Sequence, residues 1–493
     1  MSNQESPARC QEFVRVAAGL FVLLFPVRLA LALMVAPEIP FYDEWDAVID
    51  GMARPLLAGN FSLHYLLVPH NEHVLFWTKG LNYLLLRAGD LQFDNVPVCE
   101  ISQFFYSGIV ATLIALAAGS LTTREKSAGG NFRSVQWWFV ASASIAAMLP
   151  YAWENIGMGW GSSYYFLIGF SAATIILAST MRASGAALVL LGIVAVSAGV
   201  SMGSGFFAAI AALLALALRV RIGTLPARGA VRMAIVLLFA AATCAALVIG
   251  RGRSPVEWST LQSIELFALL LLLSPAWILL LRLWRGQGSN ADVAFVCVAV
   301  WGLMQACAIL LGRPVFRLWY PISRYVDVLA LTGFAAIGCL CRLAIAEPIP
   351  HAWTALSRIV MGGAIVLSLA FAPFAWNAMN LRADHQREQT TRLVNYIHGG
   401  DTGAIEHAPA DTLPYPQRDR LRHLLDASDV RRILGDEAGT RAAPSVFVEN
   451  VRIVNARLAS NALWILPVTT MLGLLILTAP RRRVPELTSA DAP

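Results

Sequence analysis

The stretch FVRVAAGLFVLLFPVRLALALMVA, residues 13–36, decides the fold class because it is an apolar run long enough to cross a lipid bilayer. A bilayer core of about 30 Å needs about 20 mostly apolar helical residues. The run follows Arg9, precedes Pro37 and is too long for the apolar part of a signal peptide, so we expect an uncleaved first helix. Arg28 is the one charge well inside this run, and Asp327 is a candidate partner for it.

The composition extends this interpretation to the whole chain. Its 493 residues are 57% hydrophobic and only 14% charged, and the mean hydropathy is +0.62, which is too apolar for a water-facing surface. Helices satisfy their own backbone hydrogen bonds in lipid, so we predict an all-α polytopic membrane protein. Twelve spans are expected, at 13–36, 98–120, 136–151, 164–181, 186–201, 205–218, 231–250, 262–281, 293–312, 325–341, 357–376 and 462–479.

Basic residues orient these spans. They gather in alternate joints, and joints rich in Lys and Arg stay in the cytoplasm. An even number of spans then places both termini in the cytoplasm of a bacterial inner membrane. The net charge of +6 therefore reflects topology, and no nucleic-acid partner is expected. The seven cysteines lie almost all in apolar runs and form no C-x-x-C pair, so neither a disulfide framework nor a zinc site is indicated.

The remaining joints are external and carry the polar segments. The long joint 37–97 mixes apolar residues with His, Asn and Lys, as helices lying in the membrane interface do. The charged segment 377–461 is punctuated by Pro and Gly and is predicted to form a small soluble cap of helices and turns. We therefore expect a transmembrane core at 1–376, the periplasmic segment 377–461, and a last helix with a cytoplasmic tail at 462–493.

Acidic and aromatic residues gather where the chain leaves the first helix, in Pro40-Phe41-Tyr42-Asp43-Glu44-Trp45-Asp46. Sugar transfer needs a carboxylate that takes the proton from an acceptor hydroxyl. Aromatic faces can hold the apolar side of a sugar or a lipid stem. The alternative is an ordinary membrane interface, which acidic residues and Trp also mark.

A second polar group, His70-Asn71-Glu72-His73, lies in the same joint. On a helix, His70 and His73 would share a face and, with a nearby carboxylate, could bind a metal. The spacing is one residue short of H-E-x-x-H, so we favour hydrogen bonds to a substrate or to the Asp43 region. No metal ligand is assigned, although a role for a divalent cation stays open.

Two further external joints carry candidate ligands for a substrate. Glu154, Asn155 and Trp160 lie in a Gly-rich stretch whose small residues let the backbone approach a ligand. Arg324 precedes Tyr325 in another external joint. An external Arg is unusual because Lys and Arg prefer cytoplasmic joints. The forked donors of its guanidinium group suit phosphate. The alternatives are an aromatic belt and arginines that extend to lipid headgroups. The same placement is expected for Arg251, Arg253, Arg313 and Arg317.

Together these residues resemble the GT-C class of integral-membrane glycosyltransferases. The resemblance rests on Asp43-Glu44 after the first helix, a long first external loop, Arg324-Tyr325 before a late span, and a soluble region near the C-terminus. Asp43-Glu44-Trp45, the His70 group and Trp153-Glu154-Asn155 also resemble a bacterial group of mostly uncharacterised multi-span proteins. The resemblance implies transfer of a sugar from a polyprenyl-phosphate donor, on the periplasmic face, to a glycan, lipid or protein acceptor.

The resemblance also implies roles for single residues. Asp43 is the preferred base and Glu44 the second choice, in an inverting displacement. Arg324 and Tyr325 would hold the donor phosphate. The remaining candidates would line the pocket; they are Tyr42, Asp46, His70, Asn71, Glu72, His73, Glu154, Asn155 and Trp160. The soluble segment lacks the acidic metal ligands and the Trp-Trp-Asp type motif of oligosaccharyltransferases, which argues against metal dependence and a peptide acceptor.

Other functions fit the same topology. A transporter or flippase of lipid-linked sugars commonly has twelve spans, but it usually places ionisable residues near the midplane, whereas here they cluster on one face. A polysaccharide polymerase or ligase would share the donor chemistry and join preassembled chains. A non-enzymatic scaffold built around 377–461 would not need polar clusters in several separate joints.

Overall fold

The structure of the chain is a computed structural model, and it describes residues 6–121, 132–248, 260–312, 323–346, 350–409, 412–435 and 445–478. Within these ranges the protein is helical and contains no strand, so the predicted all-α class is confirmed. Some basic residues of the predicted topology lie outside the described residues or have undescribed side chains; they are Arg124, Lys126, Arg133, Arg251, Arg253, Arg313, Arg317 and the arginines at 481–483.

The longer helices are α1 (Ser6–Val35), α3 (Phe76–Ala88), α4 (Asn95–Leu121), α5 (Phe132–Met148), α7 (Ser162–Thr180), α8 (Gly185–Ser201), α9 (Phe207–Arg221), α10 (Ala227–Val248), α11 (Thr260–Leu272), α12 (Ser274–Trp284), α13 (Asn290–Gly312), α14 (Val326–Ala346), α15 (Pro350–Gly399), α19 (Val446–Ser460) and α20 (Ala462–Thr478). Short helices connect them at η2 (Trp45–Ala53), α2 (Arg54–Leu57), η3 (Leu63–Leu67), η4 (Pro150–Ala152), α6 (Trp153–Gly157), η5 (Gly159–Gly161), η6 (Gly203–Phe206), η7 (Ser323–Tyr325), α16 (Gly403–Glu406), α17 (Arg418–Asp426) and α18 (Ser428–Leu434).

The described residues contain 8 helices that are long and apolar enough to cross a membrane. Two bent pairs, α11 with α12 at 57° and α19 with α20 at 77°, raise this number to as many as 10. Helix α8 is apolar but shorter. The chain is therefore a multi-pass membrane protein by length and composition of its helices, and the count of twelve spans stays a prediction.

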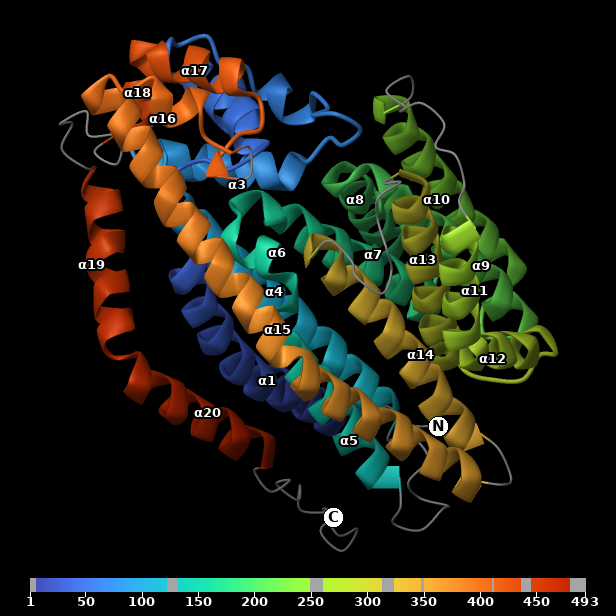
Figure 1. The fold of residues 1–493 in the computed structure, drawn as a ribbon. Coiled ribbons are helices and arrows are strands. Elements are labelled where there is room, and N and C mark those ends of the chain that lie inside the picture. The colour runs from blue at the N-terminus through green and yellow to red at the C-terminus, as the bar shows by residue number, and fades with distance from the viewer. Residues whose placement is uncertain are drawn as a thin grey trace, which may run out of the picture.

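The first and last helices lie side by side (Figure 1). Near the start of α1, Arg15 Nη1 donates hydrogen bonds to Leu477 O at 2.7 Å and to Ile476 O at 3.2 Å, both near the end of α20. Gly19 permits this close packing, because a Cβ there would lie 2.9 Å from the Leu477 side chain. The beginning of α1 and the end of α20 are therefore at the same end of the bundle.

Helix α15 is the longest element and connects the apolar bundle to the cap, defined here as residues 403–434. It has 50 residues, and a rise of 1.5 Å per residue gives it a length of about 75 Å. It runs diagonally across the bundle in Figure 1 and is continuous through residue 377, where we placed the start of the soluble segment. The polar part of α15 thus extends the last predicted core span without a break.

Ion pairs hold the cap against the joint that follows α1, residues 37–97. Arg54 Nη1 lies 2.7 Å from Asp50 Oδ1, and Arg54 Nε lies 2.7 Å from Asp429 Oδ2. Arg420 of α17 pairs with Asp50 and, at 3.3 Å between Nε and Oδ1, with Asp46. Because η2 carries Asp46 and Asp50, these pairs hold the cap next to the segment that follows Asp43 and Glu44 (Figure 1).

Candidate functional site

Glu44 is a buried side chain that joins the segment after α1 to the segment between α6 and α7. Its side chain accepts hydrogen bonds from Phe41 N at 2.8 Å and from Trp160 N at 3.0 Å. Burial raises the pKa of Glu44 from 4.5 to about 7, against the lowering effect of the two backbone donors and of Arg382. Both carboxylate oxygens are engaged, so Glu44 fixes the chain after α1 against η5.

Asp43 is the accessible member of the acidic pair. Its side chain is 48% exposed, and its Oδ1 lies 3.8 Å from His70 Nε2. The neighbouring Tyr42 is 40% exposed and has a left-handed backbone with a φ of 48°. This turn directs the adjacent residues differently, with Glu44 inside the protein and Asp43 at the surface next to an imidazole.

The helical interpretation of His70 to His73 is wrong. These residues form a tight turn, in which His70 N donates to His73 O at 2.7 Å and His73 N to His70 O at 3.0 Å. Asn71 takes a φ of 52° at the exposed tip of the turn. Pro69 precedes the turn and disfavours helical backbone at the residue before it.

The two histidines of this turn have different neighbours. The His70 ring packs edge-on against the Trp160 ring at 5.9 Å, next to Asp43. His73 Nδ1 instead accepts a hydrogen bond from Gly203 N at 3.0 Å, and its Nε2 lies 3.7 Å from Glu72 Oε1. Among the described residues, no group of three or more His, Cys, Asp and Glu side chains is arranged to hold a metal ion.

Two joints far apart in sequence meet at Glu154 and Asn155. Glu154 Oε2 accepts hydrogen bonds from Ser323 Oγ at 3.1 Å and from Arg324 N at 3.0 Å. Asn155 Nδ2 donates to Arg324 O at 2.9 Å and to Asp327 Oδ2 at 3.1 Å. Helix α6 is thereby bound to η7, and these contacts fix the backbone that carries Arg324.

Two arginine side chains reach this region with buried nitrogens, Nε of Arg324 and Nη2 of Arg382, that have no hydrogen-bond partner among the described residues. Arg382, on α15, is only 8% exposed, and its guanidinium lies 3.5 Å from the centroid of the Phe41 ring. Asp43 and Glu154 are among the charges that act on Arg324, and Glu154 also acts on Arg382. The acidic residues and both guanidinium groups therefore share one electrostatic environment.

Sequence reasoning did not find Arg382. The predicted span ended at residue 376, so Arg382 fell into the segment that we expected to be soluble. The available signal was its position six residues beyond the end of an apolar run, where a continued helix keeps the side chain near the bilayer surface. A buried guanidinium nitrogen without an acceptor is costly, which makes Arg382 a candidate ligand for an anion.

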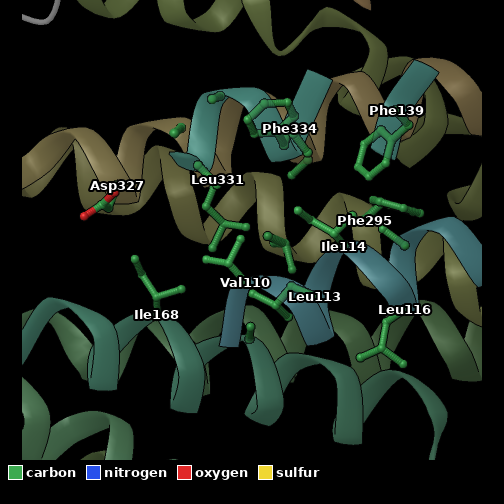
Figure 2. Close-up of a pocket in the computed structure, with 18 of the residues that line it drawn as sticks. Val110, Leu113, Ile114, Leu116, Phe139, Ile168, Phe295, Asp327, Leu331 and Phe334 are labelled. Carbon is green, nitrogen blue, oxygen red and sulfur yellow. The ribbon is translucent and has the colours of Figure 1, made fainter. Parts of the chain in front are cut away.

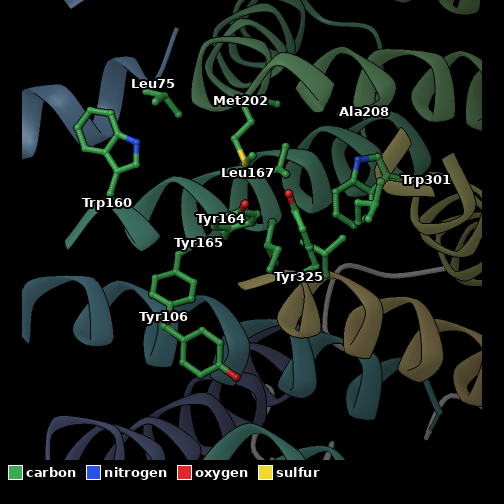
Figure 3. Packing of buried hydrophobic residues seen from close by; sticks show 14 of the residues in the cluster. Leu75, Tyr106, Trp160, Tyr164, Tyr165, Leu167, Met202, Ala208, Trp301 and Tyr325 are labelled. Atoms are coloured by element: carbon green, nitrogen blue, oxygen red, sulfur yellow. The ribbon is translucent and has the colours of Figure 1, made fainter. Parts of the chain in front are cut away.

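Arg28 lies within the bundle, close to the site, and its polar partners come mainly from α4 and α7. Its Nε donates to Gln103 Oε1 at 2.9 Å, its Nη2 to Tyr165 Oη at 3.1 Å, and its guanidinium lies 4.0 Å from the Tyr106 ring. The proposed partner Asp327 acts on Arg28 through its charge. Figure 3 shows Tyr106 and Tyr165 together in this packing.

The other predicted residues have mainly structural contacts. Asp46 accepts hydrogen bonds from Tyr415 Oη at 2.5 Å and from Arg420 Nε at 3.3 Å, so the cap occupies it. Tyr325 is 6% exposed and packs edge-on against Tyr164 at 5.7 Å (Figure 3). Both residues are less exposed than Asp43.

The structure thus brings together Asp43, Glu44, His70, Glu154, Asn155, Trp160, Arg324 and Arg382, which we call the acid–arginine cluster. Its members come from the first external joint, the α5–α7 connection, η7 and α15. Comparison with protein-family models, curated proteins and solved structures yields no match to this chain. A functional interpretation therefore depends on the chemistry of the cluster.

Proposed function

We propose that the protein is a membrane glycosyltransferase that moves a sugar from a polyprenyl-phosphate donor to an acceptor hydroxyl. The observation that carries this proposal is the pair of buried, unpartnered guanidinium nitrogens of Arg324 and Arg382 in the same cluster as the accessible carboxylate of Asp43. Guanidinium groups bind phosphate through charge-assisted hydrogen bonds. A carboxylate at hydrogen-bond reach of a hydroxyl can act as its general base.

In the proposed reaction, Asp43 takes the proton of the acceptor hydroxyl as that oxygen forms a bond to the anomeric carbon of the donor sugar. The bond from this carbon to the phosphate oxygen breaks, and the polyprenyl phosphate leaves with the electron pair. Arg324 and Arg382 stabilise the leaving phosphate. A single displacement of this kind inverts the anomeric carbon, and the protein supplies mainly orientation and charge.

Glu44 takes a different role in this proposal. Both of its oxygens accept backbone hydrogen bonds, and the side chain is fully buried, so it positions Asp43 and the segment of Trp160. His70 lies beside Asp43 and helps to orient its carboxylate. The first-choice base of the sequence analysis therefore stays the proposed base, and the second choice becomes a positioning residue.

We place the cluster on the periplasmic face of a bacterial inner membrane, with both termini in the cytoplasm. Arg15 at the start of α1 and Arg342 near the end of α14 belong to the opposite end of the bundle, where Arg342 Nη1 donates to Ser120 O at 2.7 Å at the end of α4. Basic residues at that end support a cytoplasmic location for it.

The test is Asp43→Asn in purified full-length protein, reconstituted with undecaprenyl-phosphate-linked radiolabelled hexoses and pentoses. We expect the rate of undecaprenyl phosphate release to fall by at least about a hundredfold, because general-base catalysis accelerates a reaction by about that factor or more. The matched control is Asp401→Asn, because Asp401 is an exposed carboxylate between α15 and α16. This variant should retain the wild-type rate. Full turnover by Asp43→Asn would remove the proposed base, and transport of intact donor across liposomes without cleavage would favour a flippase.

A further inference from the structure

The bundle contains an apolar cavity of about 300 Å³ between α4, α5, α7, α13 and α14. Its walls include Val110, Leu113, Phe139, Ile168, Phe295 and Phe334 (Figure 2). Pockets of this size and lining hold small apolar ligands or parts of larger ones. The cavity lies between helices of the bundle, and part of its lining, such as Leu116, is exposed.

The cavity is long in the direction of the helices. Tyr106 and Ser120 of α4 both line it, and a rise of 1.5 Å per residue separates them by about 21 Å along the helix. This is about two thirds of a bilayer core of about 30 Å. An apolar cavity of this length suits a hydrocarbon chain that lies along the helices.

One end of the cavity adjoins the acid–arginine cluster. Asp327 lines this end, and Figure 2 shows it apart from the apolar side chains. Asn155 Nδ2 donates to both Asp327 Oδ2 and the backbone oxygen of Arg324, so this end of the cavity is one side chain away from the backbone of Arg324. A lipid whose chain lies in the cavity with its head at this end would therefore have that head next to η7.

The other end reaches the surface of the bundle. Leu116 lines the cavity and is 39% exposed, and Thr180, at the end of α7, is also an exposed lining residue. In Figure 2, Leu116 lies at the end away from Asp327.

We propose that this cavity holds the polyprenyl chain of the donor, with the donor phosphate at Arg324 and Arg382. The inference rests on the proposed function, and it adds that the enzyme recognises the length of the donor's hydrocarbon chain as well as its phosphate head. A narrower cavity should then weaken long-chain donors and spare donors whose chain ends before the constriction.

The kinetic test uses Ala143→Leu and Ala335→Leu, which enlarge two buried residues of the wall. We expect each to raise KM for undecaprenyl-phosphate-linked sugar by about tenfold or more, since a few methylenes in an apolar pocket change discrimination by that order. Citronellyl-phosphate-linked sugar should keep its KM in the same variants. The matched control is Ala242→Leu on the exposed face of α10, which should change neither value.

A binding test separates this inference from the proposed function. An undecaprenyl phosphate that carries a diazirine in its distal half is photolysed with the purified full-length protein, and the labelled peptides are identified by mass spectrometry. Labelling of α4 and α14 around Leu113 and Phe334, lost in Ala335→Leu and kept in Ala242→Leu, supports the cavity even if no sugar is transferred. Labelling confined to the outer surface, or displaced equally well by phosphatidylglycerol, overturns it, and sugar transfer would then still support the glycosyltransferase.

Discussion

Arg382 offers the sharpest test of the anion site, because the structure predicts opposite effects on stability and on binding. Its Nη2 is buried and has no hydrogen-bond partner in the part of the chain that the structure describes, and the whole residue is only 8% exposed. Replacement by Met keeps most of the side-chain length, and it removes the guanidinium together with its contact with the Phe41 ring. In the absence of ligand, Arg382→Met should therefore leave the stability unchanged or raise it, since removing an incompletely paired buried charge is often neutral or favourable.

The same substitution should weaken binding of a phosphate lipid. A hydrogen bond to a charged group contributes about 1.5–3 kcal/mol, which corresponds to about 10- to 100-fold in the dissociation constant. At a ligand concentration of about 100 times the dissociation constant, the wild-type protein gains about 2.7 kcal/mol of stability. At the same ligand concentration, Arg382→Met should lose about half of this gain if the dissociation constant rises about tenfold, and most of it if the constant rises about a hundredfold.

The assay is thermal unfolding of the detergent-solubilised full-length protein with and without undecaprenyl phosphate. Arg387→Met is the matched control, because Arg387 lies on the same helix and its side chain is 76% exposed and paired with Asp384. The control should keep the full ligand-induced shift. If Arg382→Met also keeps it, or if the variant is strongly destabilised without ligand, Arg382 is a structural residue and the argument for an anion site fails.

Two further predictions concern buried charges. Between about pH 4.5 and about 7, Glu44 of the native protein holds a proton that Glu44 of the unfolded chain has released. The free energy of unfolding should therefore fall as the pH rises through this window. The total decrease is about 3 kcal/mol, because one pKa unit corresponds to about 1.4 kcal/mol. Glu44→Gln should flatten this pH dependence of thermal unfolding, and an unchanged slope would contradict the raised pKa. Arg342→Met should cost about 3–5 kcal/mol, because it leaves Asp292, now 2.6 Å from Arg342 Nε, as a buried unpaired charge. The double variant Arg342→Met/Asp292→Asn should recover part of that loss in the same assay, and equal instability of single and double variants would refute the pairing.

The helical membrane fold was predictable because hydropathy is a local property of the sequence. The first apolar run was predicted to end at residue 36, and α1 ends at Val35. Bends were not predictable in the same way, because residues 262–281 form one apolar run but two helices that meet at 57°. Packing against neighbouring helices decides such breaks, and the composition of the run does not contain that information.

The residues of the cluster were predictable in part. External joints that carry carboxylates and arginines indicated Asp43, Glu154 and Arg324, and the structure places these three in one electrostatic environment. The turn at His70 was not predicted, because the spacing of the two histidines was considered only as it would lie on a helix, although Pro69 precedes them. Arg382 was missed because its burial arises from α15 packing against the first external joint, which no local pattern records.

The contrast between Asp43 and Glu44 explains how two adjacent carboxylates can serve different purposes. Glu44 is fully buried and accepts two backbone hydrogen bonds, so moving it to meet a substrate would break the connection between the first joint and η5. The Asp43 side chain is 48% exposed, so a substrate can reach it without breaking that connection. Where environments separate two neighbouring acids in this way, the solvated one is free to exchange protons with a substrate and the buried one holds the geometry. Exchanging the two residues, as Asp43→Glu with Glu44→Asp, should therefore abolish sugar transfer even though both carboxylates remain, because the shorter buried acid no longer reaches both backbone donors.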